Sequence, residues 1–138
     1  MTIIDTSIFV TLFAERDPKH GDVVAWYANE RDAPITTPLA VAEMDYMLRK
    51  HGGEPAAQAL QANLASGALG VAWWPDALEA TLKVARRRTD IGLTDASLVA
   101  LAAHLGTKRI ATLDHRHFRT LKPLTGDDGF TLLPADAD

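Results

Sequence analysis

The first seven residues constrain the fold more than any other stretch of the chain. Residues 2–4 are Thr-Ile-Ile, a short β-branched run typical of a strand buried on both faces of a parallel sheet. Asp5 follows directly, and Thr6 and Ser7 are residues that begin helices. Ligands of open α/β sheets bind beyond the carboxyl ends of the strands, so Asp5 stands where chemistry is expected. Taken alone, Asp5 is equally well explained as the cap of the following helix.

The rest of the chain alternates between strand and helix patterns. Strands are predicted at residues 2–4, 34–38, 70–74, 108–113 and 130–133. Helices are predicted at residues 7–14, 17–31, 38–50, 55–66, 76–88 and 94–105, with Asp17 and Thr94 as caps and Gly52-Gly53 as a break. This alternation predicts an α/β fold of three layers, with a central, mostly parallel sheet flanked by helices. We expect residues 1–138 to form a single domain.

Composition narrows the function classes. The chain has no cysteine, which excludes disulfides, thiolate metal sites and a cysteine nucleophile. No stretch approaches the length of a membrane-spanning helix and no signal peptide is recognisable, so we expect a cytoplasmic protein without a membrane partner. The net charge of −4 argues weakly against nucleic-acid binding by the whole surface. Basic residues at 86–88 and 108–122 indicate local basic surfaces, or simply solvated helix faces.

Three further carboxylates resemble Asp5 in their placement. Asp114 follows the strand predicted at 108–113, Asp95 lies in the first turn of a helix, and Glu43 shares a helical face with Leu39, Tyr46 and Met47. Each has an ordinary explanation: a turn residue, an acid that interacts with the helix dipole, and an acid at the boundary of a helix face. Four such acids together point instead to one acidic site.

Such a site predicts a particular chemistry. Clustered carboxylates repel one another, and a divalent cation removes that penalty. Oxygen ligands suit Mg²⁺ or Mn²⁺, which bind substrate phosphates and activate water. The sequence therefore favours hydrolysis of phosphodiester bonds.

Two rival carboxylate chemistries fit less well. A haloacid-dehalogenase-type phosphatase needs a second aspartate two residues after the first, where this chain has Ser7. A receiver domain needs an acidic pair near Asp5, which is missing. His115 and His117 lack the helical spacing of a zinc site and add little to the prediction.

Four sequence blocks resemble the PIN domain, specifically the VapC-type toxins of bacterial toxin–antitoxin pairs. The blocks are Ile4-Asp5-Thr6-Ser7, Ala42-Glu43, residues 92–102 (GLTDASLVALA) and residues 110–118 (IATLDHRHF). Their order and spacing cover nearly the whole chain.

The resemblance implies a PIN-like fold and a Mg²⁺-dependent endoribonuclease, with Mn²⁺ as a substitute ion. The implied catalytic acids are Asp5, Glu43, Asp95 and Asp114. Asp5 and Asp95 would hold the metal most directly, often with Asp114, and Glu43 would act partly through water. Thr6 and Thr112 match hydroxyl residues that orient the acids, and Arg116 is a candidate RNA contact. Asp90 is an additional acid that stands near the predicted site and is a candidate substitute for one of the four.

The family also implies partners. A VapB-type antitoxin would cover the site, and the toxin would form a homodimer. Two alternatives remain open from the sequence: a stand-alone PIN nuclease of RNA maturation, and a catalytically silent PIN-like binding module. The presence of all four acids argues against the silent module.

Overall fold

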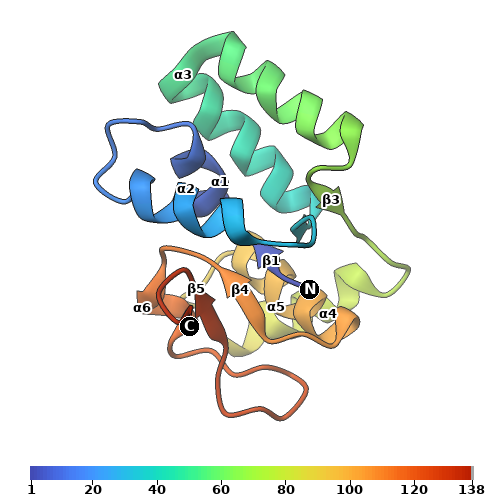
Figure 1. Ribbon diagram of the computed structural model, residues 1–138. Coiled ribbons are helices and arrows are strands. Elements are labelled where there is room, and N and C mark those ends of the chain that lie inside the picture. Colours follow the sequence, from blue (N-terminus) through green and yellow to red (C-terminus); the bar gives the residue numbers. More distant parts are fainter. Residues whose placement is uncertain (138) are drawn as a thin grey trace.

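The structure, a computed structural model, describes residues 1–137. It contains a five-stranded sheet with helices packed around it (Figure 1). The strands are β1 (Ile3–Ile4), β2 (Ile35–Thr36), β3 (Gly70–Val71), β4 (Arg109–Ala111) and β5 (Thr131–Leu133). The helices are α1 (Thr6–Leu12), α2 (His20–Asn29), α3 (Pro38–Ser66), α4 (Ala77–Arg87), α5 (Leu93–Leu105) and α6 (His115–Phe118). The predicted α/β fold, with a parallel sheet flanked by helices, is confirmed.

The order of the strands places a crevice at the centre of the sheet. The order is β3-β2-β1-β4-β5, and each pairing is parallel. Ile3 of β1 lies opposite Ile35 of β2 and Ile110 of β4. The chain builds β2 and β3 on one side of β1, then crosses to the other side for β4 and β5. Such a reversal opens a crevice beyond the carboxyl ends of the strands, where Asp5 and Thr112 follow β1 and β4.

Helix α5 is the most deeply buried helix segment and carries one wall of that crevice. Residues 96–102 are all buried, as expected of a helix that is apolar on every side. Ser97 is the polar exception: its hydroxyl donates to the Thr94 carbonyl at 2.7 Å and lies 2.8 Å from the hydroxyl of Thr37, the N-cap of α3. This contact ties the first turn of α5, which contains Asp95, to the start of α3.

Helix α3 bends in the middle, where two separate helices are predicted from the sequence. Residues 38–66 are two helical arms joined at a kink. Gly53 at this kink has φ 70° and ψ −163°, a conformation that residues with a Cβ rarely adopt. The two arms, residues 38–52 and 54–66, fold back beside each other in the upper part of Figure 1. The predicted break at the glycine pair is therefore confirmed.

Two predicted helix starts are wrong. Asp17 does not cap α2, which begins at His20; instead its side chain accepts a hydrogen bond from the Lys19 amide at 2.8 Å and closes a turn. Thr94 does not cap α5, whose N-cap is Gly92. In both cases a capping residue type is present, but the chain enters the helix at a neighbouring position.

Within residues 1–137, no helix combines the length and the apolar character needed to cross a bilayer.

Candidate active site

A pocket of about 620 Å³ opens at the central crevice and is lined by all four predicted acids. Asp5 follows β1, Glu43 comes from α3, Asp95 from the first turn of α5, and Asp114 from the segment after β4. The other lining residues are Thr6, Ser7, Met47, Gly92, Leu93 and Thr94. Acids that are far apart in the sequence therefore meet in one place, as the strand-end pattern predicts.

Asp5 is the most buried of the four, with 5% of its surface exposed. It caps α1, since its Oδ1 accepts a hydrogen bond from the Thr6 amide at 2.7 Å. Its Oδ2 accepts hydrogen bonds from Ser7 Oγ at 3.0 Å and Thr112 Oγ1 at 2.8 Å. Burial raises the pKa of Asp5, and these hydrogen bonds oppose the rise. The two predicted roles of Asp5, helix cap and pocket acid, are thus both present in the structure.

Two hydroxyl groups connect Asp5 to the segment that carries Asp114. Thr112 Oγ1 donates to Asp5 and accepts the Asp114 amide at 2.9 Å. Ser7 Oγ donates to Asp5 and accepts the Leu113 amide at 3.0 Å. We call Asp5, Ser7, Thr112 and Asp114 the strand-end network. Its members hold the loops after β1 and β4 in a fixed relation.

Ser7, and not Thr6, supplies the hydroxyl that orients Asp5. The Thr6 hydroxyl does not reach an acid; it donates to the Ala40 carbonyl at 3.5 Å, and only the Thr6 backbone contacts Asp5. Ser7, which carried no predicted role, supplies the hydroxyl contact instead. Its position two residues after Asp5, on the first turn of a capped helix, is the signal that could have identified it.

Glu43 lies on an exposed part of the pocket rim, which corrects the predicted buried stripe of its helix. The buried face of this arm of α3 is formed by Ala40, Met44 and Leu48, whereas Tyr46 is 63% exposed. Glu43 is exposed, one position round the helix from that face. Both sets of residues have helical spacing, and the small Ala40 packs inward more closely than the larger apolar side chains.

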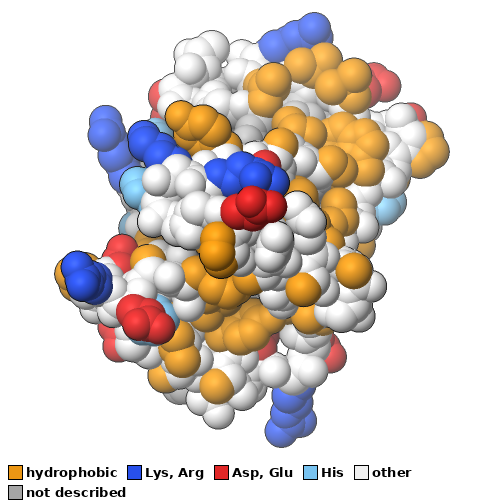
Figure 2. Space-filling view, turned by 90° about the horizontal axis from the view of Figure 1, so that it is seen from above, with side chains coloured by type: hydrophobic (Ala, Val, Ile, Leu, Met, Phe, Trp, Pro, Cys, Tyr) orange, Lys and Arg blue, Asp and Glu red, His pale blue; other side chains and the backbone are white. Residues whose placement is uncertain are grey.

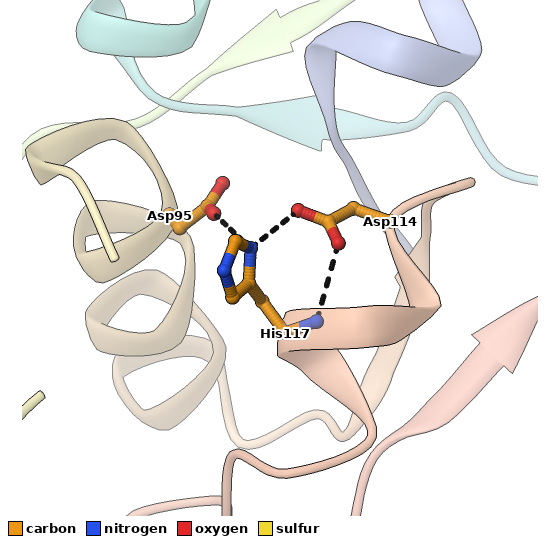
Figure 3. A group of neighbouring side chains, drawn as sticks. All are labelled: Asp95, Asp114 and His117. Atoms are coloured by element: carbon orange, nitrogen blue, oxygen red, sulfur yellow. Dashed lines mark hydrogen bonds and ion pairs between the residues drawn. The ribbon is translucent and has the colours of Figure 1, made fainter. Parts of the chain in front are cut away.

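Asp114 and Asp95 meet across the pocket through His117 (Figure 3). Asp114 caps α6: its Oδ1 accepts the His117 amide at 3.2 Å, and its Oδ2 lies 2.8 Å from His117 Nδ1. Asp95 Oδ2 lies 4.0 Å from the same nitrogen. His117 is therefore part of the site, contrary to the sequence-based expectation that it adds little. Contact at i+3 from a capping aspartate is the local signal for it.

The charges in the pocket act most strongly on Asp95. Burial, followed by the neighbouring charges of Asp5, Asp114 and Glu43, raises the pKa of Asp95 to about 7, and His117 opposes this rise. At neutral pH the carboxylates thus cannot all ionise freely without a positive partner. The donors are carboxylate oxygens with one imidazole nitrogen nearby, a set that fits a hard or borderline divalent cation.

Three other predicted residues lie outside this group. Arg116 is exposed on α6 and does not line the pocket, and His115 lines a different cavity beside α2. Asp90 is held by Arg88, whose guanidinium donates to it at 2.8 and 2.7 Å, and this bond lowers the pKa of Asp90 to about 2. Asp90 is thus committed to an ion pair and does not line the acidic pocket.

The basic triplet at residues 86–88 contributes to a second, larger cavity. This cavity of about 880 Å³ lies between α4 and residues 120–126. Its cationic lining residues are Lys83, Arg87, Arg88 and Lys122. The predicted local basic surface is therefore present on an acidic protein. The acids that line this second cavity are Asp76 and Glu79, and neither lines the acidic pocket.

Known proteins resemble this chain in both sequence and fold. The sequence model of the PIN domain family matches residues 2–122. Ribonuclease VapC26 of Mycobacterium tuberculosis (strain ATCC 25618 / H37Rv) is 36% identical over 135 residues, which cover 96% of this chain and 99% of that protein. The crystal structure of Mycobacterium tuberculosis VapC20, a sarcin–ricin loop cleaving toxin, shares the fold with a TM-score of 0.73. That match covers 80% of this chain and 87% of the other, at 22% identity. The chain therefore belongs to the PIN domain family.

Proposed function

We propose that this protein is a Mg²⁺-dependent endoribonuclease that acts as the toxin of a toxin–antitoxin pair. The observation that carries the proposal is the meeting of four carboxylates, from two strand ends and two helices, in one pocket. The likeness to ribonuclease VapC26 over nearly the whole length of both proteins supports RNA as the substrate. We further propose that residues 1–138 act as one domain and that the protein works in the cytoplasm.

We infer a role for each acid from its place in the pocket. Asp5, Asp95 and Asp114 would hold the ion, with Asp5 and Asp95 as its most direct ligands, and Glu43 would act from the rim through water. Mg²⁺, or Mn²⁺ in its place, would lower the pKa of a bound water and stabilise charge on the phosphate. Thr112 would keep Asp5 oriented through its hydrogen bond. Arg116, exposed on the short helix that Asp114 begins, would contact an RNA phosphate.

Two alternatives are less well supported. A silent binding module has no need of carboxylates at all four positions, and all four line the pocket. A stand-alone nuclease of RNA maturation would use the same pocket. The toxin is favoured because the relative of 36% identity is a VapC protein.

A toxin of this kind requires inhibition, and the surface of α1–α3 fits a VapB-type antitoxin. In the view of Figure 2, hydrophobic side chains gather on the face that includes α3. Phe13, Val24 and Tyr46 are the large exposed hydrophobic residues of these three helices. Phe9 of α1 does not contribute to this surface, because it packs in the core and is 1% exposed. We expect the antitoxin on this face and a homodimer of the toxin.

An antitoxin arginine would suit the acidic pocket, because a guanidinium binds carboxylates in a bidentate manner. It would then compete with the ion for Asp5, Asp95 and Asp114. Inhibition of RNA cleavage by the purified antitoxin should therefore weaken as the Mg²⁺ concentration rises. Inhibition that is independent of Mg²⁺ would place the block elsewhere.

The nuclease proposal is tested by cleavage of a mixed-sequence RNA with purified protein and Mg²⁺. Asp5→Asn should abolish cleavage, since the amide keeps the shape of the carboxylate but loses its charge. Asp22→Asn is the matched control, because Asp22 is exposed on α2 and does not line the pocket. Equal cleavage by the Asp5→Asn protein and the wild type would refute the proposal.

A further inference from the structure

The geometry points to His117 as a nitrogen ligand of the divalent ion beside the carboxylates, which would give the site a preference for Mn²⁺ over Mg²⁺. This inference rests on the proposed function, since it concerns the ion of the same pocket. One ligand atom from each of Asp95, Asp114 and His117 lies within 4.8 Å of the other two. In Figure 3 the imidazole stands between the two carboxylates and faces both.

The distances around the imidazole fit an octahedral ion. With bonds of roughly 2.1 Å, neighbouring ligand atoms of an octahedral ion lie about 3.0 Å apart and opposite ones about 4.2 Å. His117 Nδ1 is 2.8 Å from Asp114 Oδ2 and 4.0 Å from Asp95 Oδ2. A tetrahedral zinc site would separate every pair by about 3.3 Å, which neither distance matches. The chosen carboxylate oxygens of Asp95 and Asp114 also lie within 4.8 Å of each other.

The local fold keeps the imidazole in this position. The His117 amide donates to Asp114 Oδ1 at 3.2 Å, so α6 is fixed to the acid that begins it. The next residue, Phe118, is fully buried and packs edge-on against Phe130. The Thr120 hydroxyl donates to the His117 carbonyl at 2.8 Å. His117 is thus anchored on both sides, while its side chain remains 28% exposed.

An imidazole ligand changes which ion the site prefers. Mg²⁺ favours oxygen ligands, whereas first-row transition ions accept imidazole nitrogen and gain affinity from it. Mn²⁺ combines acceptance of nitrogen with the octahedral geometry that the distances fit. For Nδ1 to bind the ion, the ring must carry its proton on Nε2, and its present bond with Asp114 would be replaced by a shared ion.

A simpler role for His117 is to position Asp114 by hydrogen bonding. The two roles differ in a measurable way. A positioning residue affects the binding of every ion through Asp114 and should lower the affinities for Mn²⁺ and Mg²⁺ by the same factor. A ligand nitrogen should matter more to Mn²⁺, so its loss should change the ratio of the two affinities.

Calorimetric titration of the RNA-free protein with MnCl₂ and with MgCl₂ tests this inference. The wild type should bind Mn²⁺ at least tenfold more tightly than Mg²⁺, and His117→Asn should reduce that ratio by about tenfold. His115→Asn is the matched control: His115 lies two residues away, lines the separate cavity beside α2 and is not part of the group formed by Asp95, Asp114 and His117, so its loss should leave the ratio unchanged. Equal losses of both affinities, or none, in His117→Asn would overturn the inference.

A second measurement on the wild type does not depend on the folding of a variant. Electron spin echo spectroscopy of the Mn²⁺-loaded protein should reveal coupling to a directly bound imidazole nitrogen, and absence of this coupling would overturn the inference. RNA cleavage by the same preparation separates the two proposals. If the wild type cleaves RNA in Mg²⁺ but lacks the coupling, only the role of His117 fails. If it binds neither ion, the metal dependence of the proposed function fails as well.

Discussion

The two sides of the acidic pocket are built differently. On the strand side, Asp5 and Asp114 follow β1 and β4, cap the helices α1 and α6, and are connected through the hydroxyls of Ser7 and Thr112. On the helix side, Glu43 stands on the exposed face of α3. Side chains that already accept several hydrogen bonds keep their positions when a ligand arrives. The strand side is therefore prearranged, while Glu43 is free to adapt to the ion and the RNA.

The largest effect is expected from removal of charge on the strand side. Asp114→Asn keeps an acceptor for the His117 amide but removes a ligand charge, so the rate of RNA cleavage should fall on the order of 10³-fold, about 4 kcal/mol of transition-state stabilisation. Single-turnover cleavage kinetics measure this rate. A decrease below tenfold would mean that the prearranged side is not where the chemistry takes place.

A smaller loss is expected when the strand-end network is broken without loss of charge. Thr112→Val removes the hydroxyl that donates to Asp5 and accepts the Asp114 amide, which should reduce cleavage by about 10- to 100-fold. It should also lower the free energy of unfolding by about 1–3 kcal/mol, because a buried amide and carboxylate lose a partner.

Thr81→Val is the matched control for this change. Thr81 is also fully buried, but within residues 1–137 its hydroxyl has no hydrogen-bond partner. Replacing that hydroxyl with a methyl group should leave stability unchanged or slightly higher. Urea unfolding of both variants compares them directly, and equal destabilisation would show that the network contributes nothing beyond the packing of a threonine.

On the helix side of the pocket, the rim residue Glu43 should respond least to mutation. Glu43→Gln should lower cleavage by less than tenfold, since an exposed side chain that acts through water is partly replaced by its amide. Asp45→Asn is the control on the same helix, because Asp45 forms an ion pair with Arg49 and does not line the pocket. If Glu43→Gln is as damaging as Asp114→Asn, the distinction between the two sides is wrong.

The pH dependence of stability without metal should reveal the repulsion within the pocket. The pKa of Asp95 is about 7, above its ordinary value of 3.8, so between about pH 4 and 7 the native state binds more protons than the unfolded state. Stability in EDTA should therefore fall as the pH rises through this window. Thermal melts should show this slope in the wild type and a flatter one in Asp95→Asn. A melting temperature that rises from pH 4.5 to 7 would contradict it.

The strand side was the part of the site that could be predicted from sequence. A β-branched run followed by an acid fixes both the strand and the place of the acid, so Asp5 and Asp114 could be located by their position alone. The face of α3 could not, because two interleaved sets of residues have the same helical period, and only packing selects Ala40, Met44 and Leu48 as the buried set. Burial of Glu43 was therefore wrongly predicted.

Contacts that depend on the exact residue at which a helix begins also could not be predicted from the sequence pattern. Ser7 contacts Asp5 and His117 contacts Asp114 because capped helices begin at these two acids, and a shift of the helix start by one residue would turn both side chains away. Thr94 and Asp17 show the same sensitivity in the opposite direction, since both were predicted caps that the chain does not use. Residue type predicts that a helix begins nearby, but not which residue begins it.

The dependence of RNA cleavage on divalent ions is the most direct test of whether the four carboxylates hold a catalytic ion. The wild-type protein, freed of metal with EDTA, should leave a labelled RNA uncut, and Mg²⁺ or Mn²⁺ in excess of the chelator should restore cleavage, with no requirement for zinc. Asp5→Asn prepared in the same way should stay inactive at every ion concentration. Cleavage by the wild type at its full rate in excess EDTA would contradict the account, because the four carboxylates would then have no ion to hold.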